Sequence, residues 1–163
     1  MGVDQRDVGR ELVAIDGSGI RVGVACGRFN DVITVRLLDG VIRGLLGFGV
    51  TEDSITIEWV PGAFEVPFAA QAMLRSGRID AAIGLGCVIR GETSHYDFVA
   101  GECARGLQDV GLATAKPAVF GVLTTENVEQ ALDRSQAPGG HNVGEECART
   151  AIEMVLLANR HRV

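Results

Sequence analysis

The chain has 163 residues, of which 47% are hydrophobic and 22% are charged, and its formal net charge is −6. This length and composition are typical of one globular domain and exclude a disordered or fibrous protein. The acidic balance, without a basic cluster, argues against nucleic acid or an anionic membrane as a partner. No apolar run reaches the length of a membrane span, and the first eight residues lack the pattern of a secretory signal, which favours a cytoplasmic location.

The predicted elements alternate between strands and helices along most of the chain. Residues 1–18 lack periodicity and are expected to form a tail or a strand added to a neighbouring surface, followed by a single domain over residues 19–163. Strands are predicted over residues 20–25, 54–60, 81–89 and 117–123. The helices between and after them are predicted over residues 63–74 and 95–110, from a Thr124-Thr125 N-cap to about residue 134, and around residues 147–156.

The first helix is predicted from apolar residues at helical spacing, and it closes at residues 47–49. These residues are Val35, Leu38, Ile42 and Leu45. Four buried strands that alternate with helices predict an α/β three-layer sandwich, in which a four-stranded parallel sheet has helices on both faces in a flavodoxin-like arrangement.

The four cysteines give no sign of a metal or redox site. They are widely spaced, form no C-x-x-C pair and lie mostly within apolar patterns: Cys26, Cys87, Cys103 and Cys147. The pattern favours reduced core thiols, and no metal or other cofactor is expected. Trp59 is expected in the core.

Each of the four strand ends is followed by residues suited to a ligand, and in an open parallel sheet such ends lie along one edge. After the first strand, Phe29 could stack on a heteroaromatic ring while Asn30 bonds the edge of that ring; alternatively, Phe29 simply covers the sheet. After the second strand, the segment from Gly62 through Ala63 and Phe64 begins a helix. Glu65 there could bond ligand hydroxyls, although taken alone it more often complements the helix dipole.

After the third strand, the backbone amides of Gly91, Glu92 and Thr93 could cradle a phosphate, with Thr93 or Ser94 capping the following helix. A lone histidine at a helix start is more often a cap or surface residue, but beside an anion site His95 is favoured as a proton carrier. The charge of Glu92 would oppose an anion, so its side chain is expected to point away.

On the fourth strand itself, Phe120 is paired with Arg134, which lies near the end of the next helix. An arginine there ordinarily complements the helix dipole, whereas the sharper hypothesis is a guanidinium that grips phosphate oxygens. Arg90 could act in the same way or could form a structural ion pair.

Together these segments resemble the lumazine synthase family over nearly the whole chain. The segments that carry the resemblance are Gly27–Asn30, Val60–Pro67, Gly86–Asp97, Gly121–Thr125, Gln130–Arg134 and the helix around residues 151–154. The third is highly specific and the others are moderately so. The resemblance implies condensation of 5-amino-6-(ribitylamino)uracil with 3,4-dihydroxy-2-butanone 4-phosphate, which gives 6,7-dimethyl-8-ribityllumazine, phosphate and water without a cofactor.

The resemblance also implies a role for each segment. Phe29 and Asn30 would hold the pyrimidine, Gly62 through Glu65 the ribityl chain, and the backbone of Cys87, Val88 and Ile89 the uracil. Gly91, Glu92, Thr93 and Arg134 would bind the phosphate, and His95 would move protons. Phe120 would belong to the site of a neighbouring subunit in a homopentamer, which in this family stays single, pairs as a decamer or closes into an icosahedral shell. Riboflavin synthase is one candidate partner.

One position departs from the family. Members often have a lysine in the late loop where this chain has Val143, and His141 is a poorly placed substitute. Two other classes of function therefore stay open beside the enzyme: a catalytically weak paralogue that binds or stores flavin-like ligands, and a purely structural shell protein. The presence of Thr93, His95 and Arg134 favours the enzyme.

Overall fold

The computed structural model describes residues 15–163 and contains a four-stranded parallel sheet in the order β2-β1-β3-β4. The strands are β1 (Val22–Gly27), β2 (Ile55–Val60), β3 (Ala81–Ile89) and β4 (Ala118–Thr125). The helices are α2 (Asp31–Gly47), α3 (Val66–Arg75), α4 (His95–Thr114), α5 (Val128–Asp133) and α6 (Val143–His161), with short 3₁₀ turns at Glu52–Ser54 and Ala63–Glu65.

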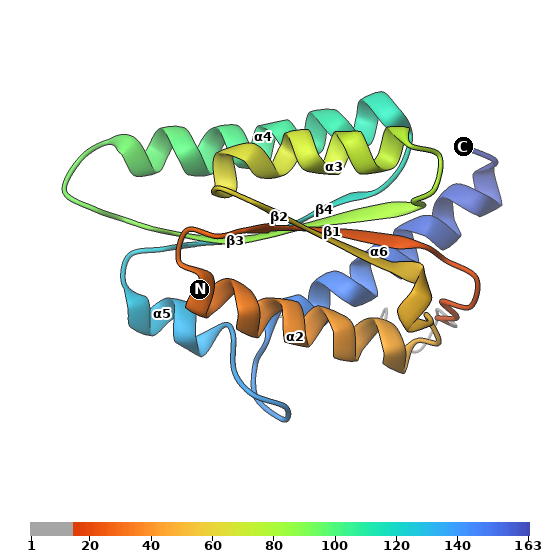
Figure 1. Ribbon diagram of the computed structural model, residues 1–163, viewed down its shortest axis with the longest axis horizontal. Helices are drawn as coiled ribbons and strands as arrows, with labels where there is room; N and C mark the ends of the chain where they lie inside the picture. Colours follow the sequence, from red (N-terminus) through yellow and green to blue (C-terminus); the bar gives the residue numbers. More distant parts are fainter. Residues whose placement is uncertain (1–14) are drawn as a thin grey trace.

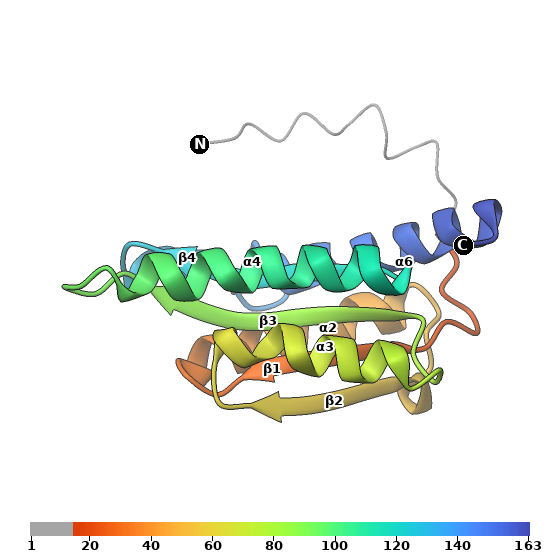
Figure 2. The same ribbon diagram turned by 90° about the horizontal axis from the view of Figure 1, so that it is seen from above.

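The sheet lies between two layers of helices. Helices α3 and α4 cover one face, and α2, α5 and α6 cover the other (Figure 1). Figure 2 shows the sheet from the side of α3 and α4, with β2 and β4 at its two edges. The predicted α/β fold with a parallel sheet and helices on both faces is confirmed.

The two central strands are buried along almost their whole length, as their short apolar sequences predict. All six residues of β1 and eight of the nine in β3 are buried. Glycines within the sheet allow close packing against the helices. A Cβ on Gly84 would lie 2.6 Å from a methyl carbon of Val66 and 2.8 Å from one of Leu107, so α3 and α4 approach the sheet more closely there than a side chain would permit.

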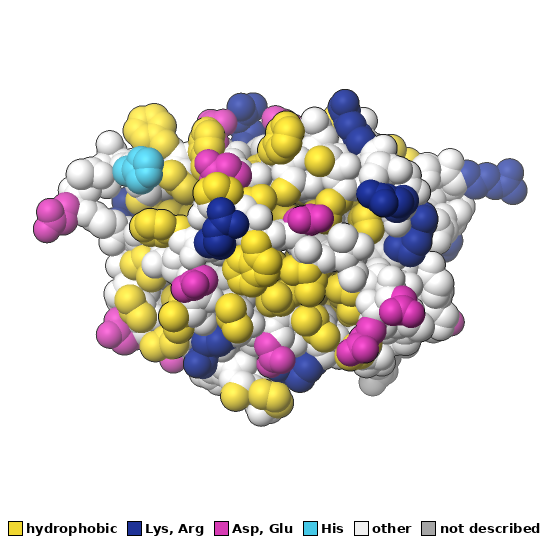
Figure 3. Space-filling view, in the orientation of Figure 1, with side chains coloured by type: hydrophobic (Ala, Val, Ile, Leu, Met, Phe, Trp, Pro, Cys, Tyr) yellow, Lys and Arg dark blue, Asp and Glu magenta, His cyan; other side chains and the backbone are white. Residues whose placement is uncertain are grey.

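The second strand was predicted to be buried, and that prediction is wrong. Four of its six residues are exposed, because within residues 15–163 β2 is an edge strand that the helices do not cover fully. Ile57 and Trp59 are 38% and 36% exposed, so Trp59 is not in the core either. Hydrophobic side chains gather in the middle of the face seen in Figure 3. Apolar residues on a strand indicate burial only if something packs on both of its faces.

Helix α2 is present as predicted, but most of the residues whose spacing predicted it do not form its buried face. Ile33, Leu37 and Val41 are buried against the sheet together with Leu45, whereas Val35 is 53% exposed. Leu38 and Ile42, whose spacing also predicted the helix, are only half-buried. Apolar residues form two adjacent stripes on this helix, and spacing alone does not show which stripe faces the core.

The end of β4 lies farther along the chain than predicted. Thr124 and Thr125 pair with Val88 and Ile89 in the sheet and do not cap a helix. The N-cap of α5 is Asn127, whose side chain accepts a hydrogen bond of 2.9 Å from the backbone N–H of Gln130. The long parallel pairing with β3 extends this strand past the residues that resemble a cap.

The remaining predictions concern helix α6, the cysteines and the N-terminal residues. The helix predicted around residues 147–156 is confirmed as part of α6, whose buried residues include Cys147, Ile152 and Val155, while Leu156 is half-buried. All four cysteines are free and buried. The predicted N-terminal tail or added strand falls mostly on residues 1–14, outside the described part, and residues 15–20 contain no strand. Within residues 15–163, no helix has both the length and the apolarity that crossing a membrane requires.

Candidate substrate site at the carboxyl edge of the sheet

A groove of about 570 Å³ lies at the carboxyl ends of β1, β2 and β3, where the first turns of α3 and α4 meet. Most of the residues predicted to bind substrate line it. Those that do are Phe29, Asn30, Gly62, Ala63, Phe64, Glu65, Cys87, Val88, Ile89, Gly91, Thr93 and His95. Three segments far apart in the sequence therefore form a single concave surface, as the topology of a parallel sheet predicts.

The turn after β1 is held in place by hydrogen bonds to both neighbouring strands. The backbone N–H groups of Arg28 and Phe29 donate to the carbonyls of Val60 and Pro61 at 2.9 and 3.1 Å. Asn30 adopts left-handed backbone angles (φ 60°, ψ 41°), which asparagine tolerates better than most residues. Its Nδ2 donates to the carbonyl of Cys87 at 2.8 Å. This turn presents the ring of Phe29, which is 74% exposed.

The second segment turns directly from strand to helix. Residues 63–65 form a 3₁₀ turn, and Pro67 lies in the first turn of α3, where a missing backbone N–H costs little. Glu65 lies at the N-cap position but makes no side-chain capping bond, and both it and Phe64 are exposed. The exposed ring and carboxylate are thus available to a ligand at the start of α3.

The loop after β3 leads to His95, the first residue of α4. The backbone N–H of His95 donates to the hydroxyl oxygen of Thr93 at 3.3 Å, whereas Ser94 makes no side-chain capping bond. The start of a long helix offers unpaired backbone N–H groups and a partial positive charge, which favours an anion. The loop extends beyond the sheet at the left of Figure 1.

The wall of the groove between these polar segments is electrically neutral. Burial raises the pKa of the Cys87 thiol to about 11, so this side chain is protonated at neutral pH. Val88 is also buried beside it. The groove therefore combines an apolar wall, a helix start suited to anions and a histidine. Within residues 15–163, no cluster of potential metal ligands accompanies them.

Three of the predicted site residues do not line the groove. The ring of Phe120 faces another surface, between α4 and α6 at the β4 edge, and is 42% exposed. Arg134 donates from Nη1 to the carbonyl of Gln130 at 2.9 Å. Glu92 lies in the β3–α4 loop but is not part of the groove wall, as expected for its side chain.

The sequence predictions missed three residues in the first turns of α4 that line the groove. These residues are Tyr96, Phe98 and Val99. Helical spacing from His95 could have identified two of them, because residues three and four positions apart lie on one helix face. Phe98 is 67% exposed, so this helix adds a third exposed aromatic ring to those of Phe29 and Phe64.

Arg90 forms an ion-paired cluster at the edge of this site. Its Nε lies 2.8 Å from Oε2 of Glu126, and its Nη1 lies 3.3 Å from Oδ1 of Asp97. Its guanidinium carbon lies 4.2 Å from the ring centroid of Tyr96. Of the two predicted roles for Arg90, the ion pair is the one present in this chain.

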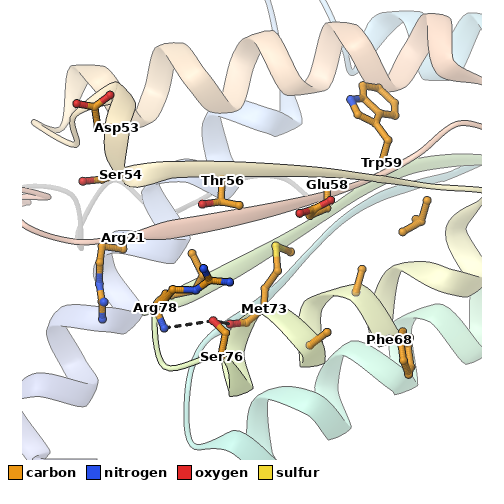
Figure 4. A pocket seen from close by; sticks show the side chains of 14 residues that line it. Arg21, Asp53, Ser54, Thr56, Glu58, Trp59, Phe68, Met73, Ser76 and Arg78 are labelled. Atoms are coloured by element: carbon orange, nitrogen blue, oxygen red, sulfur yellow. Dashed lines mark hydrogen bonds between the residues drawn. The ribbon is translucent and has the colours of Figure 1, made fainter.

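A second groove, of about 800 Å³, runs between the β2 edge and α3 (Figure 4). It contains Trp59 and Phe68, together with charged groups of both signs, among them Glu58 and Arg78. At its far end, the backbone N–H of Arg78 donates to the hydroxyl of Ser76 at 3.2 Å. Among the described residues, neither a histidine nor the start of a long helix lines this groove. The first groove is therefore the better candidate for chemistry.

One protein-family model covers nearly all of the described residues, both grooves included. The model described as 6,7-dimethyl-8-ribityllumazine synthase matches residues 19–159. The match includes all four strands of the sheet and all the residues that line the groove.

Proposed function

The chain belongs to the 6,7-dimethyl-8-ribityllumazine synthase family, an enzyme family of riboflavin biosynthesis, and on that premise we propose that it is an active synthase. The proposed reaction joins 5-amino-6-(ribitylamino)uracil to 3,4-dihydroxy-2-butanone 4-phosphate and releases phosphate and water. The proposed location is the cytoplasm.

One observation carries this proposal: a single groove joins an aromatic surface to a histidine and the start of a long helix, a position suited to anions. The exposed rings of Phe29 and Phe64 are suited to a flat heterocycle and its ribityl chain. The amides of Gly91 and Thr93, at the start of α4, suit the phosphate of the second substrate. We propose that the two substrates bind at these two ends of the groove, so that amine and ketone meet between them.

The proposed chemistry needs little beyond this arrangement. The aromatic amine attacks the ketone and water leaves. The phosphate is then eliminated, and the enol left behind tautomerises to a new carbonyl at the carbon that bore the 3-hydroxyl. The second amine closes the ring on that carbonyl with loss of another water. Holding both substrates together supplies much of the acceleration, because it removes the entropy cost of their meeting. His95 would move protons during imine formation and phosphate loss, a contribution of about 10²–10⁴-fold in rate.

The positions of Phe120 and Arg134 support a site completed by a second copy of the chain. Neither lines the groove of its own subunit, and Phe120 is exposed at the opposite edge of the sheet from β2. We propose a homopentamer in which a neighbouring copy supplies Phe120, and in which Arg134 reaches the phosphate only in the assembly. Pairing into a decamer, closure into a shell and contact with riboflavin synthase stay predictions.

The test is to mix the purified protein with both substrates and to follow lumazine fluorescence and phosphate release together. An active synthase gives both signals at equal rates. Analytical ultracentrifugation of the same sample checks the pentamer. Turnover by a monomer would contradict the proposal that a second copy completes the site.

Val143 favours the alternative of a weak, ligand-binding paralogue. This residue begins α6, and it packs against the core and lines the surface that also carries Phe120. A valine there supplies no positive charge to a neighbouring site. Tight binding of the ribityl substrate with neither lumazine nor phosphate formed would favour the paralogue, and Val143→Lys would then be expected to restore turnover.

A further inference from the structure

The loop Gly91–His95 carries the proposed phosphate-binding amides and the proposed proton carrier, yet it has little packing of its own. All five residues are exposed. A Cβ placed on Gly91 would have no heavy atom within 4 Å. A loop with so few buried contacts is positioned mainly by the groups that hold its two ends.

Arg90 precedes this loop and contacts residues that follow it. The guanidinium stacks over Tyr96 at 4.2 Å, and Nη1 donates to Asp97 at 3.3 Å; both partners lie in the first turn of α4. Its Nε donates to Glu126, just beyond β4, at 2.8 Å. The backbone N–H of Arg90 donates to the carbonyl of Thr125 at 2.9 Å.

The side chain of Arg90 therefore connects three elements: the end of β3, the start of α4 and the segment after β4. A planar guanidinium can stack on a ring while it donates in its plane to two separate carboxylates, whereas a lysine ammonium cannot do both. The single positive charge of Arg90 also offsets part of the negative charge of Asp97 and Glu126, which would repel an anion.

We propose that Arg90 is a positioning residue, which fixes the distance between the two ends of the Gly91–His95 loop and so aims its amides and His95 at the phosphate-bearing substrate. This inference rests on the proposed function for its kinetic consequences but not for its structural ones. Arg90 is not part of the groove wall, and its Nε and Nη1 are already bonded to carboxylates, so it acts through the loop.

Hydrogen exchange tests the structural part without substrate. In Arg90→Met, the hydrogen-bonded backbone amides of His95 and Asp97 are expected to exchange about tenfold faster, because one exposed ion-pair network and one stacking contact are lost. Arg105→Met is the matched control, since Arg105 also pairs with two carboxylates on α4, Glu102 and Asp109, but far along the helix from the loop. Unchanged exchange in Arg90→Met, or an equal increase in the control, would overturn the proposal.

Kinetics test the consequence for the reaction. In Arg90→Met, we expect KM for the butanone phosphate to rise about tenfold and KM for the pyrimidine to stay within twofold, since the loop serves the phosphate end. Arg90→Lys keeps the charge but not the stacked geometry, so it should restore only part of the loss. Equal changes in both KM values, or full rescue by lysine, would contradict a positioning role.

Two outcomes separate this inference from the proposed function. If the wild-type protein shows no turnover, the proposed function fails, while the exchange experiment still decides the role of Arg90. If Arg90→Met does not fold, Glu126→Gln removes the charge from a single contact, and it should accelerate exchange at the amides of His95 and Asp97 by a smaller factor. No acceleration in a folded Glu126→Gln variant would then refute the proposal.

Discussion

The two ends of the same parallel sheet differ in how their polar groups are used. At the amino ends, Asp80 accepts hydrogen bonds from the backbone N–H, Nε and Nη2 of Arg21 at 2.8, 3.1 and 2.7 Å. Lys116 donates to the carbonyls of Leu74 and Ile79, at the end of α3 and just before β3, at 3.2 and 3.0 Å. Charged side chains there bond to other groups of the same chain.

At the carboxyl ends, aromatic rings, helix-start amides and a histidine instead face an open groove. The difference follows from helix polarity. The helices end near the amino ends of the strands, where their free carbonyls attract cations such as Lys116, and begin near the carboxyl ends, where free N–H groups attract anions. One end of the sheet is thus expected to serve stability and the other to serve binding.

The largest effect expected from this separation of stability and binding is the loss of turnover in a His95 variant. His95→Ala should slow the reaction by about 10²–10⁴-fold but not abolish it, because substrate positioning remains. The free energy of unfolding should change by less than about 0.5 kcal/mol, as is usual for an exposed residue. Stopped-flow fluorescence and urea unfolding measure the two quantities. Complete loss of activity with both substrates still bound would contradict this division of roles.

Asn30 is expected to be an exception to this separation of stability from binding. It lines the groove at the carboxyl ends, and its side chain also stabilises the turn after β1. Asn30→Ala loses the bond to the Cys87 carbonyl and must hold left-handed backbone angles, which together should cost about 2 kcal/mol of unfolding free energy. Asn30→Gly relieves the backbone strain and should recover about half of that loss. Urea unfolding of the pair separates the two contributions. Equal stability of the two variants would show that the backbone angle contributes nothing.

The Asp80–Arg21 pair tests the proposed stabilising role of the amino ends of the strands. The hydrogen bonds from Arg21 hold the pKa of Asp80 below its ordinary value, so its stabilisation is complete above the unfolded-state pKa of about 3.9 and is lost as pH falls through the lower folded-state value. Asp80→Asn should cost about 1–2 kcal/mol at pH 7, since Arg21 is half exposed and screened by water. Turnover should not change.

The pH dependence provides the control for this prediction. Between pH 5 and pH 2, the difference in unfolding free energy between wild type and Asp80→Asn should shrink. Asp133→Asn, at an exposed carboxylate on α5, is the control for the substitution itself and should change the free energy of unfolding by less than about 0.5 kcal/mol at pH 7. A wild-type advantage that grows on acidification would mean that the sign of the pKa shift is wrong.

The smallest effect is expected at Lys116. Lys116→Met keeps much of the side-chain length but loses two bonds to carbonyls, at a cost of about 1 kcal/mol. Thermal unfolding followed by circular dichroism measures it. Turnover should not change. If turnover falls in proportion to the loss of stability, the amino ends of the strands also affect the reaction, and the proposed separation of the two ends is wrong.

The fold and most of the groove could be predicted because both follow from local patterns. Short β-branched strands alternating with amphipathic helices leave few topologies, and in a parallel sheet every strand end falls on one edge. Residues placed directly after a strand, such as Phe29, Ala63 and His95, therefore come together whatever the details of packing. The family resemblance rests on these same segments and is confirmed by the family match.

Other features depend on partners that are distant in the sequence. Whether Ile33 or Val35 faces the core depends on how α2 packs against the sheet, and whether Trp59 is buried depends on what covers the β2 edge. The sequence alone does not show whether Arg90 binds a ligand or forms an ion pair, because its partners Asp97 and Glu126 are brought to it by packing. Backbone topology follows from hydrophobic periodicity along the chain, but the choice among polar or apolar partners is made only when the elements pack together.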